Sequence, residues 1–202
     1  MAVGRRAVVL ALVVPGVGWA QPAGPAAPIV ALNAALRAGM QAGGAVPFAE
    51  RAARLRPAVE RAFDLSAILA ASVGPRFGGF SEAGQAALLA AFTAFTVATW
   101  ASNFDSDGGE VFEVLPETRA SGADQVVTTR IVPPAGVATR LDYVMRQGEG
   151  GWKAVDILLN GTISRVAVQR SDFRSLVGGG DPAPLIDSLR RRTEGLAGGA
   201  QP

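Results

Sequence analysis

The chain lacks the side chains on which most catalytic and metal sites depend. None of its 202 residues is a cysteine or a histidine, which excludes disulfides, thiolate ligands, cysteine nucleophiles and imidazole bases. It has a single lysine, Lys153, and a single tyrosine, Tyr143. A catalytic site would have to be built from carboxylates, serines and arginines, and no pattern of these in the sequence pairs a nucleophile with a base. We expect a protein that is not an enzyme and that holds no metal ion and no cofactor.

An excess of charge of one sign is also missing. The chain has 19 basic and 17 acidic residues, and without Arg5 and Arg6 the two signs balance at 17 each. The only run of basic residues, Arg190–Arg192, is most simply one solvated turn of a helix. Because no basic cluster is interleaved with aromatic residues, we expect no nucleic-acid partner.

The first 20 residues are typical of an export signal. Arg5-Arg6 precede the apolar segment Ala7–Val14, and the small residues of Gly18-Trp19-Ala20 suit a signal-peptidase cut before Gln21. The apolar segment is too short to span a bilayer, which requires about 20 residues. We expect a signal peptide over 1–20 and a mature protein in the periplasm; a retained N-terminal anchor is the alternative.

Apolar residues recur at helical spacing in the first half of the mature chain, after a flexible leader over 21–28. The expected helices cover residues 29–41, 47–63, a short segment that Asp64 caps and Gly74-Pro75 stops, and 82–104, which Ser81 caps. Pro57 should bend or divide the second of these helices.

The segment 82–104 is unusual because no charged residue lies between Glu82 and Asp105. Its length alone would suit a transmembrane helix, but its threonine, serine, asparagine and glutamine side chains argue against an isolated span. Its alanines share one face and predict close contact with a neighbouring element: Ala87, Ala90, Ala94, Ala98 and Ala101. Four bulky residues share another face: Leu88, Leu89, Phe92 and Phe95. We expect a buried helix whose bulky side packs on the core or on an apolar ligand.

The pattern changes after Asp105 to the alternation typical of strands. Four strands are expected, over 110–117, 124–132, 137–146 and 152–159, and their short links predict an antiparallel meander. In the third strand the dry face should carry Leu141, Tyr143 and Met145, and the wet face Asp142 and Arg146. Helices over 163–178 and 182–196 follow, and 197–202 should form a disordered tail. The predicted fold class is α+β, a single domain over 29–196 in which N-terminal and C-terminal helices wrap a four-stranded antiparallel sheet.

The dipeptide Asn160-Gly161 raises a question, because Asn-Gly between apolar runs usually indicates a hairpin. The residues after it have helical spacing, so we expect Gly161 to turn the chain off the sheet and into a helix. Asp156 and Arg170 straddle this turn and could pair, which would give them a structural role. The sequence Asn160-Gly161-Thr162 also matches a glycosylation sequon, but the turn explains these residues without a sugar.

The acidic loop Asp105–Glu110 loosely resembles a calcium-binding loop. It is too short for an EF-hand, so we expect a solvated turn between a helix and a strand.

The segment Gly151–Phe173, GWKAVDILLNGTISRVAVQRSDF, resembles the signature of the MlaC and toluene-tolerance family of periplasmic lipid-binding proteins. In that signature an aromatic-led strand ends in Asp-Val, a glycine turn follows, and a serine-containing helix runs on to Arg-Ser-x-Phe. The corresponding residues here are Trp152, Val155-Asp156, Gly161, Ser164 and Arg170–Phe173. The part from Ile163 to Phe173 is particularly similar to the hopanoid-associated HpnM branch. The resemblance is strong over 110–190 and weaker over 28–109, and the long uncharged segment departs from the phospholipid branch.

The resemblance implies an NTF2-like or cystatin-like fold whose sheet and helices enclose an apolar lipid cavity. It implies a monomeric shuttle for a phospholipid or hopanoid-type lipid, with an inner-membrane ABC transporter carrying an MCE-type ring as partner, and an outer-membrane lipoprotein complex as a further partner. Apolarity and position select the candidate lining residues: Leu65, Ile68, Leu69, Phe77, Phe80, Leu88, Phe92, Phe95, Trp100, Leu141, Tyr143, Ile157 and Phe173.

Two other kinds of protein remain open from the sequence. An interaction or scaffold protein would use its sheet to dock a partner and would have a filled core without a cavity. A carboxylate-based hydrolase on an NTF2-like cone would need two acidic residues that face one pocket.

Overall fold

The structure, a computed structural model, describes residues 24–198. The expected signal peptide over 1–20 lies outside these residues, as do parts of the expected leader and tail. The helices are α1 (Ala27–Ala42), α2 (Phe48–Ala62), α3 (Leu65–Val73), α4 (Glu82–Asn103), α5 (Arg165–Phe173) and α6 (Ala183–Ala197), with short 3-10 helices η1 (Gly43–Ala45) and η2 (Gly74–Gly79). The strands are β1 (Val111–Ser121), β2 (Asp124–Val132), β3 (Thr139–Gly148), β4 (Gly151–Leu159) and β5 (Ile163–Ser164). The α+β class is confirmed.

Side-chain caps begin two of the N-terminal helices where the sequence placed them. The Asp64 carboxylate accepts a hydrogen bond from the Ala67 amide at 2.9 Å, and the Ser81 hydroxyl accepts one from the Gly84 amide at 3.1 Å. Pro57 was expected to bend or divide the second helix, and division is excluded because α2 is continuous from Phe48 to Ala62. Its buried face, which includes Leu55 and Val59, packs into the core, and this packing outweighs the missing backbone hydrogen bond.

The sheet has five antiparallel strands in the order β1-β2-β3-β4-β5, one more than expected. The first four form the predicted meander, and β2 has the bounds that the sequence indicated. Strand β1 continues to Ser121, with an irregularity between Val114 and Thr118 where Pro116 cannot donate a ladder hydrogen bond.

The fifth strand arises because Asn160-Gly161 forms a hairpin after all. Both residues have positive φ, 52° and 76°, and the Thr162 amide donates to the Leu159 carbonyl at 3.2 Å. Ile163 then pairs with Leu159 before the helix starts. The chain therefore stays in the sheet for two more residues, Ile163 and Ser164, before α5 begins. The expectation that the turn takes the chain directly off the sheet is wrong.

Helix α5 is shorter than the expected 163–178, because Ser164 caps it and turns follow Phe173. The Ser164 hydroxyl accepts a hydrogen bond from the Ala167 amide at 3.0 Å. A helix N-cap has extended backbone, and this allows Ser164 to end β5 and begin α5 at once.

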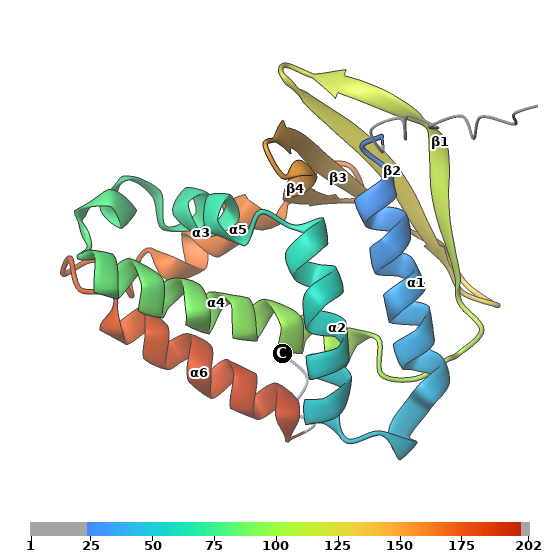
Figure 1. Cartoon of the computed structure of the whole chain (residues 1–202), viewed down its shortest axis with the longest axis horizontal. Coiled ribbons are helices and arrows are strands. Elements are labelled where there is room, and N and C mark those ends of the chain that lie inside the picture. The colour runs from blue at the N-terminus through green and yellow to red at the C-terminus, as the bar shows by residue number, and fades with distance from the viewer. Residues whose placement is uncertain (1–23, 199–202) are drawn as a thin grey trace, which may run out of the picture.

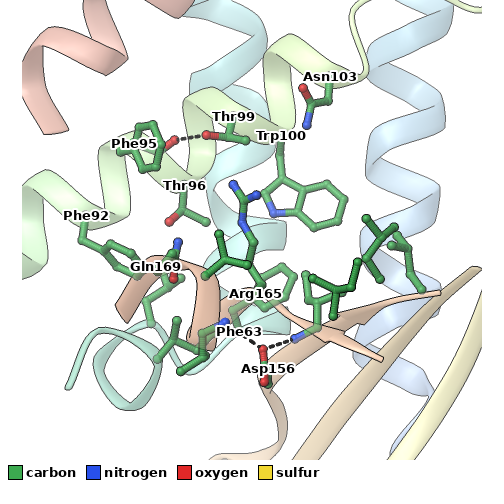
Figure 2. A pocket seen from close by; sticks show the side chains of 18 of the residues that line it. Phe63, Phe92, Phe95, Thr96, Thr99, Trp100, Asn103, Asp156, Arg165 and Gln169 are labelled. Carbon is green, nitrogen blue, oxygen red and sulfur yellow. Dashed lines mark hydrogen bonds between the residues drawn. The ribbon is translucent and has the colours of Figure 1, made fainter. Parts of the chain in front are cut away.

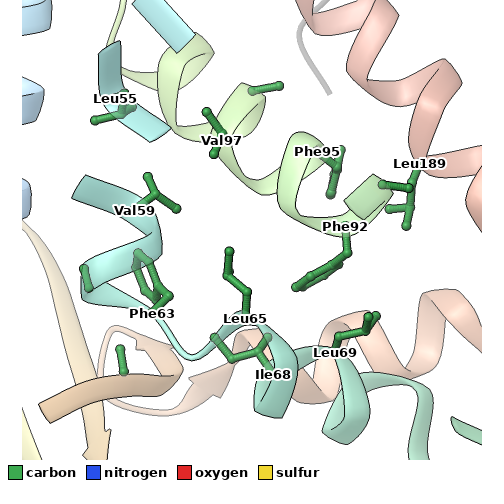
Figure 3. Packing of buried hydrophobic residues seen from close by; sticks show 14 of the residues in the cluster. Leu55, Val59, Phe63, Leu65, Ile68, Leu69, Phe92, Phe95, Val97 and Leu189 are labelled. Atoms are coloured by element: carbon green, nitrogen blue, oxygen red, sulfur yellow. The ribbon is translucent and has the colours of Figure 1, made fainter. Parts of the chain in front are cut away.

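The helices lie to one side of the sheet, with α4 and α6 side by side and α3 and α5 between that pair and the strands (Figure 1). Figure 3 shows the core where α2, α3, α4 and α6 meet, with Val59, Leu65, Phe92, Phe95 and Leu189 among the buried residues. The link between α2 and α3 is tied to the sheet, because the Asp64 amide donates to the Ala154 carbonyl of β4 at 2.9 Å.

Helix α4 is long and apolar enough to cross a membrane by length and composition, with a mean hydropathy of 1.3. It packs instead against α6 and α2 within the domain. Its alanine face is buried only towards the C-terminal end, at Ala98 and Ala101, while Ala87 and Ala90 are exposed. The expected contact along the whole alanine face is therefore wrong for its first half.

Candidate functional site

A cavity of about 430 Å³ lies between α4, α5, the end of α2, α3 and the strands β2–β5 (Figure 2). Its wall is mostly apolar, and its size is in the range that holds small-molecule ligands. The lining residues are Phe63, Leu65, Ile68, Phe92, Phe95, Thr96, Thr99, Trp100, Asn103, Phe104, Ile131, Thr139, Leu141, Asp156, Ile157, Leu159, Ile163, Arg165, Val166, Val168 and Gln169.

The cavity has a buried end and an exposed end. Side chains at the buried end include Phe92, which is 1% exposed, and Leu65, Ile68, Phe95 and Gln169, none of which is more than 8% exposed. The lining residues with exposed side chains, which mark the mouth, are Asn103, Thr139, Leu159, Ile163, Arg165 and Val168. A ligand would thus have one end away from water and the other in contact with it.

One face of α4 runs along this cavity from the buried end to the mouth. Phe92, Phe95, Thr96, Thr99 and Asn103 follow one another at spacings of one to four residues, which places them on one side of a helix. From Phe92 to Asn103 the helix rises about 16 Å at 1.5 Å per residue. The slot is therefore elongated along α4.

Aromatic rings form the wall beside the mouth. The Phe63 and Trp100 ring centroids lie 5.6 Å apart, and Trp100 stacks on Phe104 at 5.5 Å. Phe104 continues the row to Phe112 of β1 at 5.5 Å. Phe63, Trp100 and Phe104 of this row line the cavity, and Phe112 packs behind them.

The structure brings seven of the predicted lining residues to the cavity: Leu65, Ile68, Phe92, Phe95, Trp100, Leu141 and Ile157. Six others do not line it: Leu69, Phe77, Phe80, Leu88, Tyr143 and Phe173. Phe173 packs edge-on behind Phe92 at 6.4 Å, and Tyr143 lies behind Phe63 at 6.2 Å. Leu69 and Leu88 are fully buried in the core, and Phe77 packs against Phe80.

Sequence reasoning missed the polar members of the lining. Thr96, Thr99 and Asn103 were used only to argue against a membrane span, although their spacing of three and four residues places them on the face of Phe92 and Phe95. This shared helical face is the feature of the sequence from which the polar lining residues could have been predicted. The Thr99 hydroxyl donates to the Phe95 carbonyl at 2.8 Å, so its methyl group is left for the cavity.

Helix α5 is held against the sheet by Asp156. Its carboxylate accepts hydrogen bonds from the Ser164 hydroxyl at 2.5 Å, the Val166 amide at 3.1 Å and the Ile157 amide at 2.7 Å. A carboxylate at the N-terminus of a helix is favoured by the helix dipole. Asp156 thus joins β4 to α5, as Figure 2 shows in part.

The expected pairing of Asp156 with Arg170 is wrong. The Arg170 guanidinium instead donates twice to the Ala71 carbonyl of α3, at 2.7 and 3.0 Å. An arginine can satisfy an unpaired helix C-terminal carbonyl in this way. Both residues therefore anchor α5, one to the sheet and one to α3.

A second polar cluster lies on the opposite face of the sheet, where Asp142 was expected to face water. Asp142 is completely buried, and Arg140 donates to both of its carboxylate oxygens, at 2.9 and 2.7 Å. Burial raises the pKa of Asp142, but hydrogen bonds from Arg140 and Thr128 and the charges of Arg140 and Arg119 together hold that pKa below its usual value. Gly161 packs against this pair, with Arg140 and Asp142 atoms 3.4 Å from where its Cβ would stand.

Few groups of the described chain could carry acid–base or metal chemistry. Burial raises the pKa of Tyr143, so the single tyrosine is neutral. Within residues 24–198 no three acidic side chains are placed to hold a metal ion. In the acidic loop, the Glu110 carboxylate accepts a hydrogen bond from the Gly108 amide at 2.9 Å, as expected for a turn.

Comparison with known proteins gives a family and a fold. The family model of the MlaC protein matches residues 33–191. The phospholipid-binding protein from Ralstonia solanacearum, solved in complex with a phospholipid, has a TM-score of 0.73 and 18% sequence identity, over 87% of this chain and 99% of that chain. At this identity the likeness establishes a shared fold. A search of curated proteins finds no match. Since the family model covers most of the domain, the chain belongs to the MlaC family.

Proposed function

We propose that the protein is a periplasmic lipid-binding shuttle, with the cavity along α4 as the site of its cargo. The observation that supports this most directly is the elongated, largely apolar cavity of about 430 Å³ with one buried and one exposed end. Each methylene removed from water contributes about 0.8 kcal/mol, so a sixteen-carbon chain gains on the order of 10 kcal/mol before binding costs. Such a slot suits lipid hydrocarbon, with the polar end of the lipid at the mouth.

The neighbour of known structure favours a phospholipid cargo. The Ralstonia solanacearum protein shares the fold and was solved with a phospholipid. The likeness of Ile163–Phe173 to the HpnM branch favours a hopanoid-type lipid instead. Lipid extraction and mass spectrometry would distinguish these two cargos directly.

Two alternative functions fit the cavity less well. A scaffold with a filled core requires that no such cavity be present. A hydrolase would need two carboxylates facing one pocket, whereas Asp156 is the one acidic residue of this lining and already accepts three hydrogen bonds. A lipid carrier is the function that the shape and the mostly apolar lining of this cavity support best.

The rest of the proposal concerns export and partners. We propose that residues 1–20 direct export, that 29–196 form the single lipid-binding domain, and that the protein acts as a monomer. The partners would be an inner-membrane ABC transporter with an MCE-type ring and an outer-membrane lipoprotein complex, the arrangement that the family resemblance implies.

Lipid transfer between vesicles tests this function. The delipidated mature chain would be mixed with donor vesicles that contain labelled phospholipid, and then with unlabelled acceptor vesicles. A carrier forms a soluble one-to-one complex and accelerates transfer in proportion to its concentration. If the chain neither takes up nor transfers phospholipid or hopanoid, the proposed function is wrong.

A further inference from the structure

Helix α5 places two hydrogen-bond donors on its cavity side. Arg165 and Gln169 both line the cavity, and residues four apart lie on one face of a helix. Along the axis they are separated by about 6 Å. Arg165 is exposed at the mouth, while Gln169 is only 8% exposed. The two donors therefore lie at successive depths of one cavity.

Gln169 has an unused donor inside the cavity. Its Oε1 accepts a hydrogen bond from the buried Ser72 hydroxyl at 3.1 Å, which directs the amide nitrogen away from Ser72. Within residues 24–198 no hydrogen bond from this nitrogen to a protein atom is found, and the nitrogen is not one of the fully buried unpaired polar atoms, so it is accessible from the cavity. A ligand that covers this nitrogen without supplying an acceptor oxygen would leave the donor unpaired, so a ligand with an acceptor at this depth would be preferred.

Arg165 likewise lacks an acidic partner. Within the described part of the chain, no carboxylate lies within 4.0 Å of its guanidinium nitrogens, unlike those of Arg140 and Arg146. Figure 2 labels Arg165 among the side chains of the lining, with Trp100 of α4 next to it in this view. Asp156 is also in the lining, but its oxygens are directed to Ser164 and the backbone. The planar guanidinium suits a phosphate with two acceptor oxygens.

We propose that α5 selects ester-linked glycerophospholipids: Arg165 binds the headgroup phosphate and Gln169 donates to an acyl ester carbonyl. In such lipids the ester carbonyls lie a few bonds from the phosphate, on the side of the hydrocarbon tails. This order matches a cation at the mouth and a neutral donor one helical turn deeper. A polycyclic hydrocarbon lipid offers neither acceptor at these positions. The inference rests on the proposed function and adds selection by two polar side chains of α5 to binding by the largely apolar cavity.

Equilibrium binding to a matched set of lipids tests the proposal. The probes are a diacyl phosphatidylglycerol, its dialkyl ether analogue without ester carbonyls, and the corresponding diacylglycerol without phosphate. The delipidated mature chain should bind the diester about fivefold more tightly than the ether, as expected for one neutral hydrogen bond. It should bind the diester roughly 10- to 100-fold more tightly than the diacylglycerol, as expected for a charge-assisted contact. Addition of inorganic phosphate alone should not displace the lipid.

Substitutions assign each preference to one residue. Gln169→Met should abolish the ester preference and keep the phosphate preference, and Arg165→Leu should do the reverse. Arg174→Leu is the matched control, since Arg174 is an exposed arginine just after α5 that does not line the cavity. If Gln169→Met fails to fold, Gln169→Glu keeps an acceptor for Ser72 and removes the donor, and it should also lose the ester preference.

The outcomes separate this inference from the function on which it rests. If the wild-type chain binds diester, ether and diacylglycerol equally, the selection by α5 is wrong while lipid carriage stands. The same holds if the Arg165→Leu and Arg174→Leu variants behave alike, or if inorganic phosphate competes fully. If no lipid binds at all, the proposed function fails as well.

Discussion

Filling the cavity should remove the cargo without unfolding the protein. Thr96 is half-buried on the cavity side of α4, so Thr96→Phe would place an aromatic ring in the slot. If the ring displaces about four methylene groups of the lipid, the loss is about 3 kcal/mol, or roughly 200-fold in affinity. The ring itself is buried in an apolar space, so the free energy of unfolding of the lipid-free chain should stay equal or rise.

The assay is titration of the lipid-free variant with a fluorescent phospholipid, next to a urea unfolding curve. The matched control is Ala90→Phe, which adds the same ring on an exposed position of the same helix, outside the cavity. It should bind lipid as the wild type does. Undiminished lipid binding by a folded Thr96→Phe variant would refute the assignment of the cavity as the cargo site.

Three further predictions concern the supports of the site. Asp142→Asn removes a buried carboxylate that Arg140 holds at 2.7 and 2.9 Å, and should lower the free energy of unfolding by about 2 kcal/mol in urea denaturation at neutral pH. Because the pKa of Asp142 is lowered in the folded state, its contribution is present above pH about 4 and is lost as the pH falls below that value, so wild type and variant should converge in acid. Gly161→Ala places a side chain at φ 76° and should cost about 1 kcal/mol in the same assay, whereas Gly150→Ala, at a glycine with open space around it, should cost less. Ser164→Ala removes the α5 cap and a hydrogen bond to Asp156, and should cost about 1–2 kcal/mol and speed amide exchange in α5 before the rest of the domain; uniform exchange would contradict the local role.

Local signals in the sequence predicted much of the fold. The caps Asp64 and Ser81 and the alternation of β2 depend on near neighbours in the chain, and each appears where it was expected. The hairpin after β4 was missed because two signals overlap there. The Asn160-Gly161 turn and the helical spacing from Val166 onwards are both correct, and Ser164 separates them.

The cavity lining was predictable only in part, because apolarity does not show which side chain stands in front of another. Phe92 and Phe173 are equally apolar, yet Phe92 faces the cavity and Phe173 packs behind it. The same holds for Phe63, which lines the cavity, and Tyr143, which lies behind it. These assignments depend on how α2, α5 and the sheet pack together, which no local pattern contains.

The partner of Arg170 shows the same limit. Nearness along the chain suggested Asp156, but the guanidinium reaches the Ala71 carbonyl, which is 99 residues away in sequence. Asp142 was expected in water for a similar reason, since alternation places it on the outer face and does not reveal that Arg140 and Gly161 cover it.

Native mass spectrometry of the mature chain, purified from the periplasm of an expressing cell without added lipid, tests the central claim most directly. The account predicts a dominant species heavier than the bare chain by the mass of one lipid, which organic solvent releases and tandem fragmentation identifies. A spectrum of bare chain only, unchanged after incubation with phospholipid and with hopanoid, would contradict it.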